Sequence, residues 1–446
     1  MVRRKPQALV QSRPELATNR EPSSTGAWPE LTPTLECRLY PHAVYNRVNQ
    51  EQKGAPSVKN DRQITQLLIA IPCAIAVVFT TLFLSILPFN RALAAKRDYI
   101  VYWATGQQLA HHANPYDGAA LSRLEQAAGF KGPESFYMRN TPWSLPLALP
   151  FGYFGAQAAA LPWSLLLLGL LFASVRMLRN LFGSAGGYLD WLGYCFPPAL
   201  FCIILGQTSI FLLLGLTLFL RLHKTHPFAA GAALWFCSLK PHLFLPFGIV
   251  LLVWIVLSRS YRILSGGIAG MAAGAIVTAC IDPDFMAQYA YYMRTSAVTR
   301  EFTPCLGDLL RDWINPAAEW IAFMPGLLGC IWALAYFWPR RHTWDWFENG
   351  SLVMLVSIFV APFGWVFDQS LAIPAVLFAV SRNTSRRMLS ILALIYMLIE
   401  IEIVSPFGLH SPAYLWTAPA WLIWYLFARA SANRAAASRL PAVENI

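Results

Sequence analysis

Residues 66–88 read QLLIAIPCAIAVVFTTLFLSILP and contain no Asp, Glu, Lys or Arg. A second run without charge covers 156–175. A helix of about 20 apolar residues is long enough to cross the hydrocarbon core of a bilayer. Only 13% of the 446 residues are charged, whereas soluble domains carry about 25%. The sequence therefore predicts an all-α polytopic membrane protein.

Twelve apolar segments are the predicted membrane helices, with a range of ten to thirteen because several are short for an upright span. They lie at about 66–88, 157–175, 188–205, 208–221, 227–239, 243–258, 263–281, 318–338, 349–361, 367–381, 388–404 and 412–428. Their number and spacing predict a bundle joined mostly by short loops.

The domain organisation follows from these segments. The predicted parts are a disordered cytoplasmic tail (1–62), a membrane domain (63–430) with long outer loops at about 89–141 and 282–317, and a cytoplasmic C-terminal tail (431–446). The first outer loop is large and contains two stretches that resemble helices.

The distribution of positive charge along the chain indicates how it is oriented in the membrane. The chain carries 34 Lys and Arg against 23 Asp and Glu, a net charge of +11. Most basic residues fall in the tails and in alternate short loops, and only Lys240 lies in the short loops on the other side. Cytoplasmic loops of membrane proteins are rich in Lys and Arg. We therefore expect both termini in the cytoplasm of a bacterial cell, a place in the cytoplasmic membrane, and no nucleic-acid partner.

Polar residues gather at the predicted outer helix ends, which places the expected chemistry on the periplasmic or exterior face. A sugar hydroxyl needs a carboxylate base to become a nucleophile, and Asp98 is the candidate. A phosphate leaving group needs fixed positive charge, which Lys240 can supply with Arg139. Gln207 and Asn140 are candidates to bind sugar hydroxyls. The sequence contains no nucleotide-binding Gly-rich loop, so the expected donor is a sugar on a membrane-borne polyprenyl phosphate.

Five short motifs resemble those of glycosyltransferase family 87, of the GT-C superfamily. Residues 97–103 (RDYIVYW) and 114–117 (NPYD) resemble its D-x-x-x-Y and N/D-P-Y-D patterns. Residues 206–207 and 239–241 resemble its G-Q and K-P motifs, and Asp368 begins an element similar to its late D-H/Q. The motifs follow the family's order over about 90–380. The resemblance implies a GT-C-like fold and an inverting hexosyltransferase that moves mannose, or a related sugar, from the lipid phosphate.

The resemblance also implies site roles. Asp98 corresponds to the family's catalytic base, and Tyr102 and Asp368 are further candidates for binding substrate. The family often has His after the late Asp, whereas this chain has Gln369, so the role of that His is absent or transferred to His242 or His410. Gln369 and His242 are therefore also candidate substrate-binding residues.

Expected partners are membrane lipids, the lipid-linked donor, and a glycan, lipid or glycolipid acceptor. We expect no cofactor and no metal, since Asp282 and Asp284 are better explained as a loop cap than as cation ligands. Two other functions remain open at this stage. A transporter or flippase of lipid-linked sugar would use Glu400, Glu402 and Lys240 for coupling, and a non-catalytic envelope-assembly protein would explain the absence of the late His.

Overall fold

The computed structural model describes residues 56–132, 136–295, 302–382, 385–405, 408 and 410–437, and these residues form helices and connections without any strand. The α-helices are α2 (Pro56–Ile86), α3 (Arg91–Ala95), α4 (Tyr99–Ala110), α5 (Gly118–Ala128), α6 (Leu149–Gly152), α7 (Ala156–Phe182), α8 (Pro197–Leu205), α9 (Ser209–Leu222), α10 (Pro227–Cys237), α11 (Leu245–Leu257), α12 (Tyr261–Ile281), α13 (Phe285–Thr295), α14 (Leu306–Ile314), α15 (Met324–Phe337), α16 (Asn349–Phe359), α17 (Ile373–Ser381), α18 (Arg386–Val404) and α19 (Thr417–Ala437). The 3-10 helices are η1 (Leu87–Phe89), η2 (Pro142–Leu147), η3 (Gly187–Trp191), η4 (Pro241–Phe244), η6 (Glu319–Phe323), η7 (Trp338–Arg340), η8 (Val366–Ala372) and η9 (Pro412–Trp416).

The all-helical prediction is confirmed for the described residues, and each of the twelve predicted segments overlaps one of the α-helices. Four helical segments are long and apolar enough to cross a membrane by length and composition. They are Ile69–Phe89, Ala156–Phe182, Tyr261–Ile281 and Glu319–Arg340. Several of the other apolar helices have fewer than 18 residues. The chain therefore has the helices of a membrane protein, and the number of twelve crossings stays a prediction.

The first and last described helices extend into the predicted tails. Helix α2 begins at Pro56, inside the predicted tail of 1–62, and α19 continues to Ala437, inside the predicted tail of 431–446. Residues 1–55 and 438–446 lie outside the described residues. Hydropathy marks where an apolar run stops, but a helix continues into polar residues that favour helix, and Pro is tolerated in its first turn.

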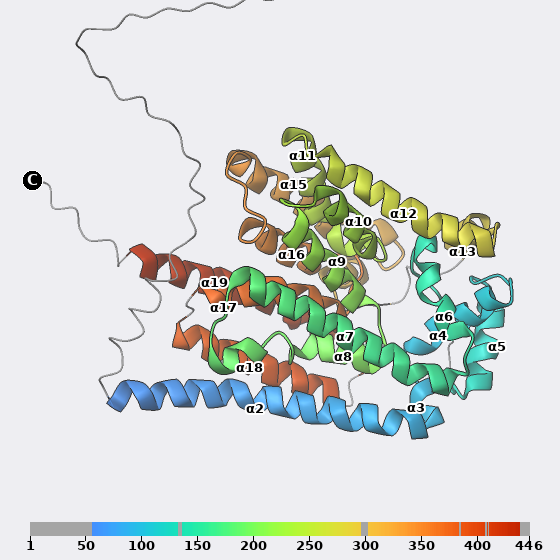
Figure 1. Ribbon diagram of the computed structural model, residues 1–446, viewed down its shortest axis with the longest axis horizontal. Coiled ribbons are helices and arrows are strands. Elements are labelled where there is room, and N and C mark those ends of the chain that lie inside the picture. The colour runs from blue at the N-terminus through green and yellow to red at the C-terminus, as the bar shows by residue number, and fades with distance from the viewer. Residues whose placement is uncertain are drawn as a thin grey trace, which may run out of the picture. The chain divides into compact units, whose positions relative to one another are not determined.

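The first long loop is mostly helical and gathers at one end of the bundle. Helices α3, α4, α5 and α6 lie together at the same end as the start of α7 (Figure 1). The two stretches expected to be helical became α4 and α5. Asp117 accepts hydrogen bonds from the backbone N–H groups of Ala119 and Ala120 and so caps α5.

Trp163 of α7 joins this loop to the bundle. Its side chain is 1% exposed, and its ring stacks on Tyr102 of α4 with a centroid distance of 5.4 Å. The indole N–H donates to the carbonyl oxygen of Gly206, between α8 and α9, at 2.8 Å. A buried Trp that both packs and donates fixes its neighbours on two sides, so α4 and the α8–α9 connection are held in register.

Candidate active site

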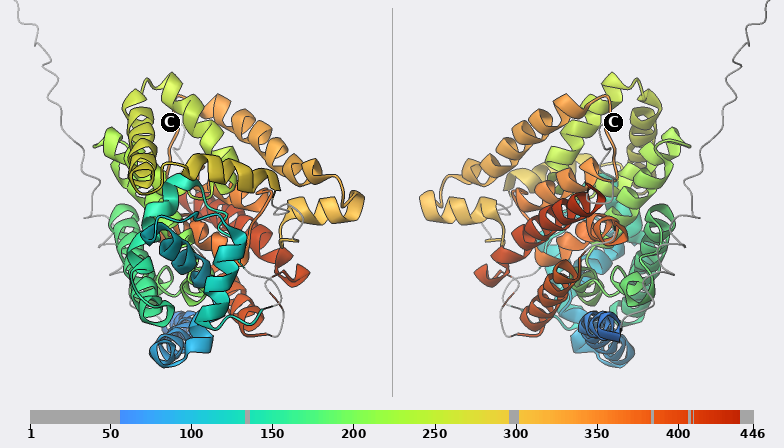
Figure 2. Two further views of the ribbon diagram at one scale, coloured as in Figure 1. Left: turned by 90° about the vertical axis from the view of Figure 1, so that its right-hand side faces the viewer. Right: turned by 90° about the vertical axis from the view of Figure 1, so that its left-hand side faces the viewer.

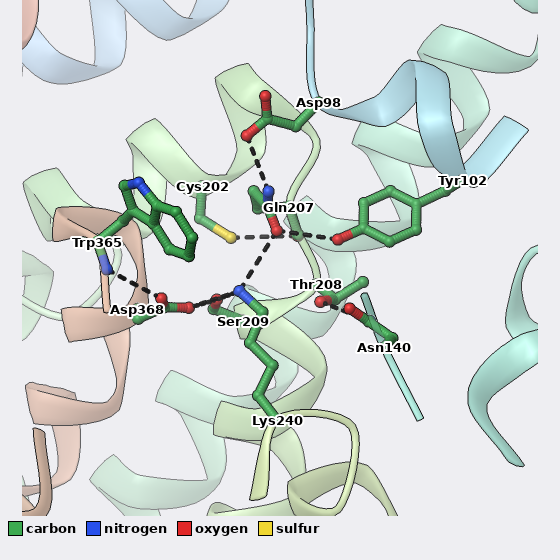
Figure 3. Close-up of polar contacts among 10 residues, drawn as sticks. All are labelled: Asp98, Tyr102, Asn140, Cys202, Gln207, Thr208, Ser209, Lys240, Trp365 and Asp368. Carbon is green, nitrogen blue, oxygen red and sulfur yellow. Dashed lines mark hydrogen bonds and ion pairs between the residues drawn. The ribbon is translucent and has the colours of Figure 1, made fainter. Parts of the chain in front are cut away.

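Four segments that are far apart in the sequence bring polar side chains together. Asp98 precedes α4, Gln207 lies between α8 and α9, Lys240 follows α10, and Asp368 lies in η8. Figure 3 shows these side chains converging, joined by a chain of hydrogen bonds and an ion pair. We call the ten residues drawn there the polar cluster: Asp98, Tyr102, Asn140, Cys202, Gln207, Thr208, Ser209, Lys240, Trp365 and Asp368.

Asp98 is buried, with 7% of its surface exposed. It occupies the N-cap position of α4, but its side chain makes no capping hydrogen bond. Instead, Oδ2 accepts from Nε2 of Gln207 at 2.8 Å, while the second oxygen points away from Gln207 (Figure 3). Burial raises the pKa of Asp98, and the Gln207 hydrogen bond and the charges of Lys240 and His410 offset part of this increase. This carboxylate has one oxygen held in place and a raised pKa, and both properties suit a general base.

Arg97 fixes the backbone next to Asp98. Its guanidinium is 3% exposed and donates to the carbonyl oxygens of Ile203 and Ile204 at 2.8 and 2.5 Å, and to the hydroxyl of Ser164 at 2.7 Å. The two carbonyls belong to the last turn of α8, where the negative end of the helix dipole interacts favourably with a cation. Arg97 therefore attaches the first long loop to α8 beside Gln207, rather than pairing with Asp98.

Gly206 makes this close approach possible. It ends α8 in the left-handed conformation, with φ of 76°, which glycine adopts at low cost. A Cβ atom at this position would lie 2.5 Å from the Cβ of Tyr99. Gly206 therefore ends α8 and leaves room for the Arg97–Tyr99 segment. The next residue, Gln207, directs its side chain to Asp98.

Lys240 and Asp368 form a buried ion pair. The distance from Nζ of Lys240 to Oδ1 of Asp368 is 2.7 Å, and the two side chains are 9% and 2% exposed. The hydroxyl of Ser209 also donates to this Oδ1, at 2.5 Å, and the backbone N–H of Trp365 donates to Oδ2 at 3.1 Å. Pro241 has no N–H and interrupts the helix, which leaves Lys240 at the junction of α10 and η4.

The Gln207 side chain links the two charged parts. Its Oε1 accepts from the hydroxyl of Tyr102 at 2.9 Å and from Nζ of Lys240 at 3.4 Å, while its Nε2 donates to Asp98. Beside it, Nδ2 of Asn140 donates to the hydroxyl of Thr208 at 3.3 Å. One amide therefore stands between a carboxylate and an ammonium group.

Six of the nine predicted site residues thus belong to the polar cluster, and three do not. Arg139 precedes Asn140 and is half-buried. His242 lies two residues after Lys240, with its ring edge against Phe363 and its buried Nε2 without a hydrogen-bond partner. Gln369 faces α19, where it donates to Thr417 and accepts from Trp421.

Four residues of the polar cluster were not predicted to bind there: Cys202, Thr208, Ser209 and Trp365. Ser209 contacts both Asp368 and Lys240, and it directly follows the Gln207–Thr208 pair, so this polar run was the signal for it. The backbone N–H of Trp365 holds Asp368, and no property of its side chain indicates such a contact. His410, an open candidate in the sequence, packs its ring edge against Trp365.

The described residues contain no group of three or more His, Cys, Asp or Glu side chains placed to hold a metal ion. Near the end of α12, Oδ1 of Asp282 accepts from the backbone N–H of Asp284 at 3.1 Å. This is the loop-cap geometry, with the carboxylate oxygen turned to the backbone two residues ahead.

The sequence model of glycosyltransferase family 87 matches residues 137–362, about half of the chain. The matched region contains Asn140, Gln207 and Lys240, and the fold brings Asp98 and Asp368 to it from either side. No curated protein and no solved structure matches the chain significantly. The extent of the family match and the membrane helices together show that this protein is a membrane glycosyltransferase of glycosyltransferase family 87.

Proposed function

We propose that the protein transfers a hexose, mannose or a similar sugar, from a polyprenyl-phosphate donor to an acceptor hydroxyl at the outer face of the bacterial cytoplasmic membrane. The observation that carries the proposal is the placement of Asp98 and Lys240 on opposite ends of the Gln207 amide. A transfer from a sugar phosphate needs a base at one side of the anomeric carbon and positive charge at the other.

In the proposed reaction, Asp98 takes the proton of the acceptor hydroxyl as its oxygen attacks the anomeric carbon. The bond from this carbon to the phosphate oxygen breaks, and its electron pair stays on the phosphate. Lys240 stabilises the charge that develops there, with Arg139 as a second candidate cation. Attack from the side opposite the phosphate inverts the anomeric centre.

Asp368 and Ser209 act on Lys240 rather than on the sugar. Their oxygens lie 2.7 and 3.4 Å from Nζ, and the Phe367 ring centroid lies 4.9 Å away. An ammonium group held on three sides loses little freedom when phosphate binds, which is how preorganised charge lowers a barrier. Tyr102 and Asn140 remain candidates to bind sugar hydroxyls beside Gln207.

His410 is the candidate to replace the histidine that this chain lacks at position 369. Its charge affects the pKa of Asp98, and its Nδ1 donates to the carbonyl oxygen of Phe302 at 2.7 Å.

Membership of a glycosyltransferase family favours transfer over the transporter interpretation. Glu402, a proposed coupling group in that interpretation, accepts a hydrogen bond from the indole of Trp416.

The proposal is tested with purified protein in lipid nanodiscs, incubated with radiolabelled polyprenyl-phosphate mannose or polyprenyl-phosphate glucose and a membrane extract as the source of acceptor. A nucleotide sugar serves as the control donor. We expect loss of label from one polyprenyl phosphate, by transfer or slow hydrolysis, and none from the nucleotide sugar. Use of the nucleotide sugar alone would refute the lipid-linked donor.

A further inference from the structure

Helix α14, in the second long loop, exposes an apolar stripe. The stripe has the helical spacing i, i+3, i+4, i+7, i+8 and consists of Leu306, Leu309, Leu310, Trp313 and Ile314. Trp313 is 83% exposed and Ile314 is 65% exposed. An amphipathic helix in a water-soluble protein turns such a stripe toward the core, whereas α14 leaves Leu309, Trp313 and Ile314 exposed, with Leu306 and Leu310 half-buried.

Two of the three charged residues of α14 face inward, and Asp312 is exposed. Asp308 and Arg311 are buried, and Nη1 of Arg311 lies 3.0 Å from Oδ1 of Asp308. Oδ2 of Asp308 accepts from the backbone N–H and the hydroxyl of Thr303, at 2.8 and 2.5 Å. Buried charges with partners on both sides hold one orientation of the helix, so the outward position of the apolar stripe is built into the fold.

Helix α14 adjoins a predicted membrane span. Figure 2 shows it beside the start of α15 and projecting from the other helices. It packs so closely on η6 that a Cβ at Gly307 would collide with the carbonyl oxygen of Ala322. Trp320 and Leu328, on the Glu319–Arg340 span, are 63% and 64% exposed. The stripe of α14 is thus followed, after a few residues, by the exposed apolar side of a helix suited to lipid.

We propose that α14 lies along the membrane interface, with lipid covering its apolar stripe. Its nine residues extend about 14 Å at 1.5 Å per residue, too short to cross a bilayer. A short helix with Trp and aliphatic residues on one side is typical of segments that lie in the interface plane. Lipid is favoured over a protein partner because the stripe continues into a predicted span.

This position connects the membrane to the polar cluster. The thiol of Cys305, just before α14, donates to the carbonyl oxygen of Pro362 at 3.3 Å, three residues before Trp365. The carbonyl oxygen of Phe302 accepts from His410. The segment 302–305 therefore links α14 to the side of the polar cluster where Asp368 lies. Through this link, the position of α14 in the interface would set the depth of the polar cluster relative to a membrane-borne donor. That consequence rests on the proposed function, whereas the contact of α14 with lipid does not.

The test places the photoreactive residue p-benzoylphenylalanine at Trp313 of the full-length protein in native membranes. Phe172, which is 52% exposed on the long helix α7, is the lipid-facing control. Arg123, exposed on α5, is the control for a surface in water. After irradiation, mass spectrometry distinguishes adducts with lipid from adducts with protein, and activity is not needed for the readout.

We expect lipid adducts at Trp313 as abundant as those at Phe172, with little at Arg123. A protein adduct at Trp313, to a second copy or to another chain, would overturn the proposal in favour of a protein interface. Labelling no stronger than at Arg123 would overturn it in favour of an aqueous surface. The same probe at Leu309 checks a second position of the stripe.

Discussion

Replacing Asp368 by Asn removes the charge that balances Lys240 in the polar cluster. The Lys240 ammonium would keep its contact with Ser209 but lose its ion-pair partner at 2.7 Å. Both side chains are nearly buried, so water cannot replace the missing charge. The substitution therefore tests whether this pair holds Lys240 in place, without changing the size of the side chain.

Removal of one partner from a buried ion pair costs about 3–5 kcal/mol. Ser209 and the Phe367 ring still stabilise the ammonium group, so we expect about 3 kcal/mol for Asp368→Asn, at the low end of that range. Lys240→Met leaves a carboxylate that retains the hydrogen bonds from Ser209 and Trp365. The double variant should lose less stability than the two single losses together, because neither charge remains unpaired.

The free energy of unfolding is measured by SDS titration in mixed micelles, for the two single variants and the double variant. The matched control is the Arg179–Asp190 pair, which has a similar distance of 2.9 Å but an Arg side chain 32% exposed. Arg179→Gln should cost at most about 1 kcal/mol. The reasoning is refuted if Asp368→Asn costs no more than this control, or if the two single effects add in the double variant.

Three further predictions concern the attachment of Asp98. Gly206→Ala forces a left-handed residue and a contact of 2.5 Å with Tyr99, so it should lower stability by at least about 1–2 kcal/mol in the same SDS titration. Gln207→Leu removes a hydrogen bond that lowers the raised pKa of Asp98. Because the base must be deprotonated, the acidic limb of the rate-against-pH profile should move to higher pH, and an unchanged limb would contradict the assignment. Arg97→Lys loses the forked contact with α8, so kcat per folded molecule, with the folded fraction measured separately, should fall with little change in donor KM; a higher donor KM at an unchanged kcat would contradict this role.

Much of the fold could be predicted because a bilayer restricts the choices. Apolar runs identified the positions of the helices, since a membrane segment satisfies its backbone groups within the helix. The helix ends were harder to predict. Helix α2 begins at Pro56 and α19 ends at Ala437, and both ends lie in polar sequence, where hydropathy does not indicate a helix boundary. The orientation of α14 depends on the buried Asp308–Arg311 pair, which becomes visible only in three dimensions.

Site residues could be predicted where a polar side chain is unusual for its place in the sequence, and not where such a side chain is common. A charged residue at a helix end in an apolar chain, such as Lys240 or Asp368, stands out against its neighbours. Gln369 has the same surroundings in sequence but faces α19, because consecutive residues of a 3-10 helix point about 120° apart. Ser209 was missed because serine at the start of a helix is usually a cap, whereas here its hydroxyl binds Asp368.

The central claim, that Asp98 is the catalytic base, is tested most directly by the single-turnover rate of sugar transfer in Asp98→Asn. Glu125→Gln is the matched control, since Glu125 is a fully buried carboxyl group of the same loop, and burial raises its pKa to about 8. We predict that Asp98→Asn inserts into the membrane and binds donor, but transfers about 10²–10⁴-fold more slowly than the wild type. Glu125→Gln should keep its rate. Transfer by Asp98→Asn at the rate of the control would contradict the account.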